Sequence, residues 1–176
     1  DETLVIRSYV ADGPTRGISV GMPNGISYCF DAEKSHVVFG WFGAFMDVGP
    51  DRGNGRGRGG RPNRTLGTRF SVGAGGFPVR IGEKKPNEVQ FRGYRRAKKE
   101  DVSFSYDVDG VSVQQKISPA KAGVGLAYQF TIEDAQSDVT FTVDREQVNA
   151  KTTKGKWNGN ELKLTLTEAK SFTVEV

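Results

Sequence analysis

The sequence contains one cysteine and one histidine among 176 residues, and these two shortages exclude several kinds of chemistry. A single cysteine, Cys29, cannot form a disulfide within the chain. A Ser-His-Asp or Cys-His catalytic arrangement would have to use His36. A zinc site would lack enough nitrogen and sulfur ligands. We therefore predict no catalytic residue, no metal site and no cofactor.

Other common features are also missing. No Cys-x-x-Cys-His motif occurs, so we expect this chain to attach no c-type haem. No run of about twenty apolar residues occurs either, so we expect no transmembrane segment. The spacing of apolar residues that is typical of long amphipathic helices is almost absent. A chain of this length can still bury a hydrophobic core, and that core must then be built from strands.

The strongest strand signal lies within residues 102–117. Every second residue from Val102 to Val108 is apolar or aromatic, and Asp109-Gly110 then supplies a two-residue type I′ turn. This turn places Val108 opposite Val111, which keeps the apolar residues of both strands on one face. Weaker strand signals cover residues 4–10, 18–20, 26–30, 37–42, 124–132, 139–143, 162–166 and 172–176.

Roughly ten or more strands favour a sandwich over a small barrel. We predict an all-β fold, an antiparallel β-sandwich formed by residues 1–176 as a single unit. Two packed sub-sandwiches that meet near residues 49–76 are the alternative. The side chains expected in the core include Phe30, Phe39, Phe91, Phe104, Tyr106, Phe130, Leu164 and Phe172.

Residues 49–76 contain ten glycines and six arginines and have little strand signal. A loop this long inside a compact domain is uncommon and often functional. Much of the excess positive charge lies between Arg52 and Arg69 and between Arg92 and Lys99, so we expect a local basic patch. RNA-binding arginine-glycine segments are usually longer, repeated and terminal, so we expect no nucleic-acid binding. We expect the arginines to pair with acids such as Asp47 or Asp51.

The aromatic segment 39–45 contains Trp41 and is flanked by Asp31, Asp47 and Asp51. Paired acids beside an aromatic platform suit glycoside hydrolysis. They equally suit a calcium site or ordinary turns at strand ends, and the sequence leaves this choice open. Trp41 itself either stacks on a sugar ring or belongs to the core, and the core is the favoured interpretation.

Two further residues and one motif have plain structural explanations. We expect His36 to lie at a strand edge and Cys29 to be a small buried core residue. Asn63-Arg64-Thr65 is a formal glycosylation sequon, which alone carries little weight. The candidate binding residues are Trp41, Asp47, Asp51, Arg56, Arg58, Arg61 and Arg64.

Several short motifs follow one another along the first two thirds of the chain. They are Arg16-Gly17-Ile18-Ser19-Val20-Gly21-Met22-Pro23, Tyr28-Cys29-Phe30-Asp31-Ala32, Trp41-Phe42-Gly43-Ala44-Phe45-Met46-Asp47-Val48, Gly57-Arg58-Gly59-Gly60, Leu66-Gly67 and Phe91-Arg92-Gly93-Tyr94. This series resembles a β-rich module of exported multidomain bacterial proteins, which often also carry c-type cytochrome or sugar-dehydrogenase-like domains. The resemblance implies an exported β-sandwich accessory part near redox or carbohydrate machinery. The resemblance assigns no catalytic residues to this chain.

We therefore expect a non-catalytic exported module, periplasmic or extracellular, that docks onto or recognises part of a larger assembly. Its partners would be other protein subunits or domains, cytochrome- or dehydrogenase-bearing ones among them, or glycans. The start at Asp1 without methionine fits a processed chain. The alternative is a carbohydrate-binding module that uses the platform around Trp41 and the Gly/Arg-rich loop. A weaker alternative is a carboxylate-dependent glycoside hydrolase.

Structure can separate these functions. A flat exposed apolar patch with a polar rim would favour docking. Exposed aromatic rings in a groove would favour glycan binding. Two carboxylates that converge about 5–10 Å apart would favour hydrolysis.

Overall fold

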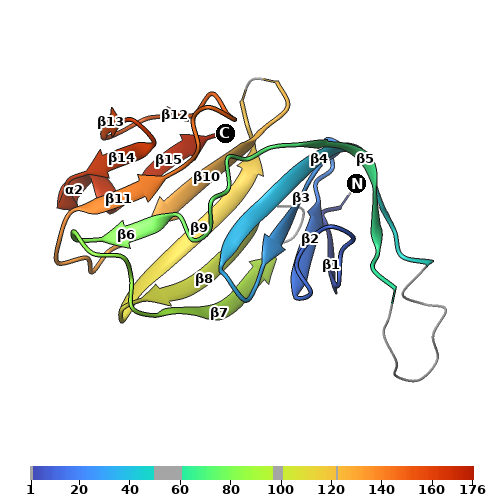
Figure 1. The fold of residues 1–176 in the computed structure, drawn as a ribbon, viewed down its shortest axis with the longest axis horizontal. Helices are drawn as coiled ribbons and strands as arrows, with labels where there is room; N and C mark the ends of the chain where they lie inside the picture. Colours follow the sequence, from blue (N-terminus) through green and yellow to red (C-terminus); the bar gives the residue numbers. More distant parts are fainter. Residues whose placement is uncertain (1, 50–60, 97–100, 122) are drawn as a thin grey trace.

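The computed structural model describes residues 2–49, 61–96, 101–121 and 123–176, which form fifteen strands and one short helix (Figure 1). The strands are β1 (Leu4–Ser8), β2 (Gly17–Gly21), β3 (Ile26–Asp31), β4 (His36–Asp47), β5 (Arg64–Phe70), β6 (Val79–Ile81), β7 (Val89–Arg96), β8 (Val102–Val108), β9 (Val111–Pro119), β10 (Leu126–Thr131), β11 (Val139–Thr142), β12 (Lys151–Thr152), β13 (Lys156–Asn158), β14 (Glu161–Leu164) and β15 (Phe172–Glu175). The helix is α2 (Leu166–Ala169). The predicted all-β fold is confirmed.

The strands form three sheets. The N-terminal sheet has the order β1-β2-β3-β4-β5, the central sheet β12-β15-β10-β9-β8-β7, and the small sheet β13-β14-β11-β6. Strands that are neighbours in the described sheets run antiparallel. Burial along β8 alternates residue by residue, because successive side chains of a strand point to opposite faces. Each sheet therefore has an apolar face that must be covered.

One face of the central sheet is shared between the other two sheets. Phe104 of β8 and Phe130 of β10 both lie opposite Gln115 of β9, so the three side chains point to the same face. Phe104 stacks on Phe30 of the N-terminal sheet with ring centroids 4.0 Å apart. Phe130 lies 5.5 Å from Phe141 of the small sheet. The result is the predicted sandwich, with its second layer divided into two sheets.

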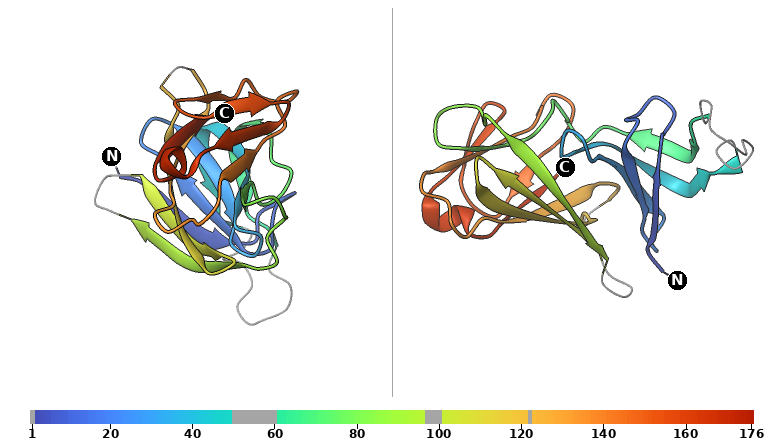
Figure 2. Two further views of the ribbon diagram at one scale, coloured as in Figure 1. Left: turned by 90° about the vertical axis from the view of Figure 1, so that its left-hand side faces the viewer. Right: turned by 90° about the horizontal axis from the view of Figure 1, so that it is seen from below.

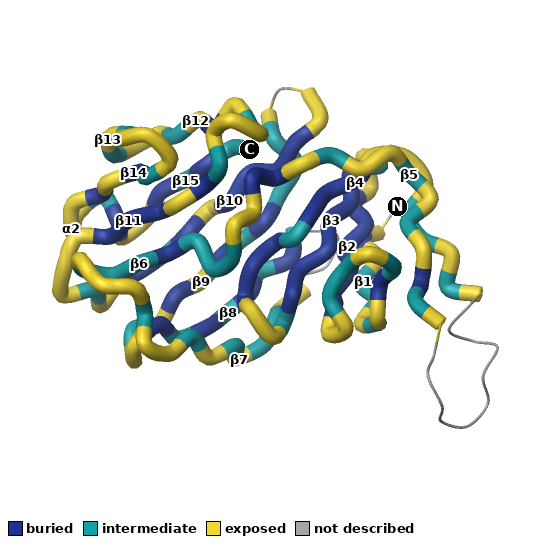
Figure 3. The backbone as a smooth tube through the Cα atoms, in the orientation of Figure 1, coloured by how far each residue is buried: buried dark blue, intermediate teal, exposed yellow. Residues whose placement is uncertain are grey.

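One contiguous cluster contains buried side chains from all three sheets, and the buried backbone follows β2 to β4 and β8 to β10 (Figure 3). Of the eight predicted core residues, Phe91 is only partly buried. The other seven are buried: Phe30, Phe39, Phe104, Tyr106, Phe130, Leu164 and Phe172.

The N-terminal sheet curls on itself (Figure 2). Asn63, just before β5, donates its N–H to Tyr9 O at 2.9 Å and accepts from the Ala11 N–H at 2.8 Å. This bridge joins the end of the sheet to the residues after β1. The curled sheet encloses a second, smaller core of Val10, Cys29, Phe39 and Trp41. Asn63 is buried, so the sequon is not accessible in the folded chain.

The β8–β9 hairpin has the predicted register, with Val108 opposite Val111. Both turn residues have positive φ, 49° at Asp109 and 85° at Gly110, as a type I′ turn requires. The Asp109 carboxylate also accepts hydrogen bonds from the backbone N–H groups of Asn87 and Glu88 at 2.9 Å. The turn therefore also fastens the segment that leads into β7.

Two expectations are wrong. Leu166 does not extend the preceding strand, because Thr165 caps a short helix there and forms a capping box with Glu168. Residues 49–76 are not poor in strand, because they contain β5, which pairs with β4 along seven residues. Four further strands, β6, β7, β12 and β13, lie outside the expected segments.

Candidate functional site

Trp41 does not form a sugar-binding platform. Its side chain is fully buried in the smaller core. Its indole Nε1 donates to the Phe45 carbonyl oxygen at 2.8 Å, and its ring stacks on that of Phe45 with centroids 5.8 Å apart. The interpretation of Trp41 as a core residue is confirmed, and this ring offers no face to a ligand.

The acidic candidates serve local turns. Asp31 is buried and accepts hydrogen bonds from the backbone N–H groups of Glu33 and Lys34. Asp47 accepts from the Gly49 N–H at 2.9 Å. These two acids end β3 and β4, and Asp31 pairs with the first residue of β4. The two acids therefore lie at opposite ends of twelve-residue β4, and each binds the backbone of its own turn.

The candidate arginines are only partly described. Asp51, Arg56 and Arg58 lie outside the described residues. Arg61 and Arg64 are exposed, and within the described chain neither forms an ion pair with Asp47, although Arg64 and Asp47 are register partners. The expected pairing with Asp47 is therefore not found in this part of the chain.

Arg69, which was not a candidate, makes the contacts expected of a structural arginine. Its guanidinium donates to the Ala11 carbonyl oxygen at 2.7 Å and to Thr65 Oγ1 at 3.1 Å. It also lies 4.1 Å above the ring of Phe39, which is a cation–π contact. Arg69 thus supports the closure of the curled sheet.

The single histidine and the single cysteine are both buried. Burial raises the pKa of the Cys29 thiol to about 12, although a hydrogen bond with Ser19 opposes this shift. Burial also lowers the pKa of His36, against the attraction of Asp31. A buried neutral thiol is a poor nucleophile. Cys29 is a buried core residue, as predicted, and His36 is the first residue of β4.

The structure has one exposed surface that the sequence analysis did not predict. Beyond Trp41, the β4–β5 hairpin projects away from the central and small sheets (Figures 1 and 2). Six exposed residues share one side of this hairpin, and we call them the hairpin face: Phe42, Ala44, Asp47, Arg64, Leu66 and Thr68. Phe42 is 49% exposed and Leu66 57% exposed. Their position on one side follows from the register, in which Phe42 pairs with Thr68 and Ala44 with Leu66.

The amino-acid sequence contains a signal for the exposed residues of the hairpin face, but this signal is ambiguous. Residues 39–45 are almost continuously apolar, so alternation alone cannot say which of them point outward. Two glycines fix the geometry. Gly67 lies so close to the Phe42 carbonyl that a side chain there would collide with the backbone. Gly43 has φ of +117°, a conformation that favours glycine.

Comparison with known proteins gives no identification: no family model, no curated protein and no solved structure matches this chain. Among the described residues, no group of three or more His, Cys, Asp and Glu side chains could hold a metal ion. The same part of the chain has no helix long and apolar enough to cross a membrane.

Proposed function

We propose that the protein is a non-catalytic module that docks onto another protein of a larger exported assembly through the hairpin face. One observation carries this proposal: two large apolar side chains, Phe42 and Leu66, are about half exposed and are diagonal neighbours on a projecting hairpin. Exposed apolar side chains that lie together mark interaction surfaces more often than isolated ones do.

The charge around this surface indicates the chemistry of the partner. Arg64, on the same side of β5 as Leu66, is exposed, and so is its register partner Asp47. Apolar side chains with a rim of both charges suit a protein surface that has an apolar centre and a polar rim. We infer that the module is exported from the resemblance of its motifs to those of exported bacterial proteins.

A crosslinking experiment tests the docking. A photoreactive residue replaces Leu66 in the protein as its own organism produces it, and a control carries the same residue at the exposed Gln114 of β9. We expect position 66 to crosslink to one defined protein, with less product in a second variant that carries Phe42→Ser. Equal crosslinking from both positions, or none from position 66, would contradict the proposal.

A further inference from the structure

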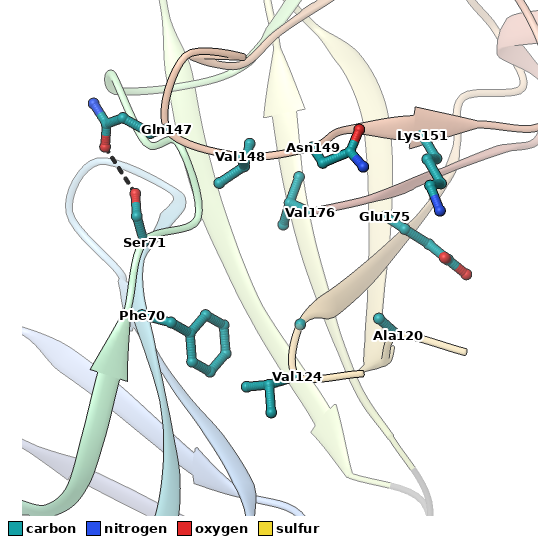
Figure 4. A pocket seen from close by; sticks show the side chains of 11 residues that line it. Phe70, Ser71, Ala120, Val124, Gln147, Val148, Asn149, Lys151, Glu175 and Val176 are labelled. Carbon is teal, nitrogen blue, oxygen red and sulfur yellow. Dashed lines mark hydrogen bonds between the residues drawn. The ribbon is translucent and has the colours of Figure 1, made fainter. Parts of the chain in front are cut away.

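An open hollow of about 330 Å³ lies where four segments meet (Figure 4). The segments are the end of β5, the connection between β9 and β10, the residues that precede β12, and β15. Its volume is in the range of small-molecule sites.

The walls of this hollow are held by hydrogen bonds. Ser71 Oγ donates to Gln147 Oε1 at 2.7 Å, and Gln147 Nε2 donates to Asp144 Oδ2 at 2.6 Å. On the opposite wall, the backbone groups of Leu126 and Val176 exchange two hydrogen bonds of 2.9 Å. The hollow is therefore formed before any ligand arrives, which lowers the entropic cost of binding.

The two sides of the hollow differ in character (Figure 4). Phe70 and Val124 form an apolar side, and Val124 is 55% exposed. Asn149, Lys151 and Glu175 lie on the other side. Within the described residues, these three side chains make no hydrogen bond or ion pair with the protein, so their polar groups are free for a ligand.

The free groups suit a neutral ligand that carries many hydroxyls. Lys151 and Glu175 have opposite charges and are direct cross-strand partners between β12 and β15, so the site has little net charge. The ammonium donates, the carboxylate accepts, and the Asn149 amide does both. A sugar ring offers hydroxyls that donate and accept at its edge, and an apolar C–H face that can pack on Phe70.

A second open hollow, of about 370 Å³, shares Lys151 and Glu175 with the first. It continues over hydroxyl and amide side chains of the central sheet, including Ser118, Gln129 and Thr173, and Lys121 also lines it. Two adjoining hollows of this kind can hold several linked sugar units.

We propose that these hollows form a binding cleft for a neutral oligosaccharide, in which Asn149, Lys151 and Glu175 bind hydroxyls and Phe70 packs against a sugar ring. This cleft is separate from the buried Trp41 and does not depend on docking through the hairpin face.

The 176-residue chain can be titrated with hexasaccharides of glucose, xylose, mannose, galactose and N-acetylglucosamine while its amide NMR spectrum is recorded. We expect at least one of them to cause saturable shifts at the Gly125 amide, which lies in the cleft, and at the side-chain amide of Asn149. Asn149→Ala and Glu175→Gln should each weaken binding at least tenfold. Gln114→Ala, on the same sheet but outside both hollows, should leave it unchanged.

Three outcomes would overturn the proposal. The first is that none of the sugars causes a saturable shift. The second is that binding is unaffected by both cleft variants, although each unfolds as the parent does. The third is that a zwitterionic dipeptide, added as a comparison, binds in the cleft while the sugars do not, which would assign the Lys151–Glu175 pair to a charged ligand.

Discussion

The ring of Phe30 lies nearly parallel to the ring of Phe104, with an interplanar angle of 16° and centroids 4.0 Å apart. Both side chains are fully buried. Phe30 belongs to the N-terminal sheet and Phe104 to the central sheet, so this contact joins the two layers. Phe91, Tyr28 and Tyr94 surround the pair within 6.3 Å, measured between ring centroids.

Replacement of Phe104 with alanine should therefore destabilise the whole sandwich. The change removes a buried ring and leaves a cavity between two sheets, so we expect the free energy of unfolding to fall by about 3–5 kcal/mol. Chemical denaturation followed by circular dichroism measures this loss. Phe42→Ala is the matched control, because Phe42 is about half exposed and its loss should cost far less. Equal effects of the two variants would contradict the conclusion that Phe104 joins the N-terminal sheet to the central sheet.

Gly110 offers a test of the turn between β8 and β9. Its φ is +85°, and a β-branched residue is strained there. We expect Gly110→Val to lower the free energy of unfolding by about 1–2 kcal/mol, as measured by thermal and urea denaturation. Gly75→Ala serves as the comparison, since a Cβ at Gly75 meets no atom within 4 Å. If both substitutions are neutral, the turn does not need its positive φ.

The sequence was informative wherever strands alternate strictly. Strand β8 pairs with β9 as Asp109-Gly110 predicted, because apolar alternation and turn chemistry both specify one register. β7 was not predicted, because its alternation is interrupted. The register shifts between Phe91 and Gly93, where Gly93 has φ of +138°, so apolar residues on either side of the bulge lose their common spacing.

The candidate sites were harder to predict for a different reason. Exposure of Phe42 and burial of Trp41 depend on how β4 curls toward β5, and residues 39–45 read as one apolar run. The oligosaccharide cleft combines Phe70, Val124, Asn149 and Glu175, which are far apart in sequence. The pairing of β12 with β15 brings Lys151 opposite Glu175, and the hydrogen bond from Ser71 to Gln147 holds the end of β5 beside the residues before β12. No local sequence pattern encodes such long-range contacts.

Cys29 should be unreactive in the folded protein. Burial raises the pKa of its thiol to about 12, so at pH 8 only about one thiol in ten thousand is the reactive thiolate. We expect labelling by iodoacetamide at pH 8 to be very slow in native buffer and complete within minutes in concentrated guanidinium, as followed by mass spectrometry. Fast labelling in native buffer would place Cys29 in an accessible, ionisable environment, contrary to its burial beside Trp41.

His36 should make the stability of the protein depend on pH. Its pKa is lowered chiefly by burial, and Lys34 adds to this effect while Asp31 opposes it. The unfolded chain therefore binds a proton at His36 near its ordinary pKa of 6.5, whereas the folded chain does so only at lower pH. Unfolding then takes up a proton, and the free energy of unfolding falls as the pH drops below about 6.5.

The position of this effect on the pH scale allows it to be assigned. His36 is the only histidine of the chain, and ordinary carboxylates contribute mainly below about pH 5. Urea denaturation between pH 7.5 and 5 should show a loss that begins near pH 6.5, with a slope of at most about 1.4 kcal/mol per pH unit for one proton. His36→Gln should remove most of that slope while the variant still unfolds cooperatively. If the slope persists in this variant, other groups carry the pH dependence and His36 is not held neutral by its burial.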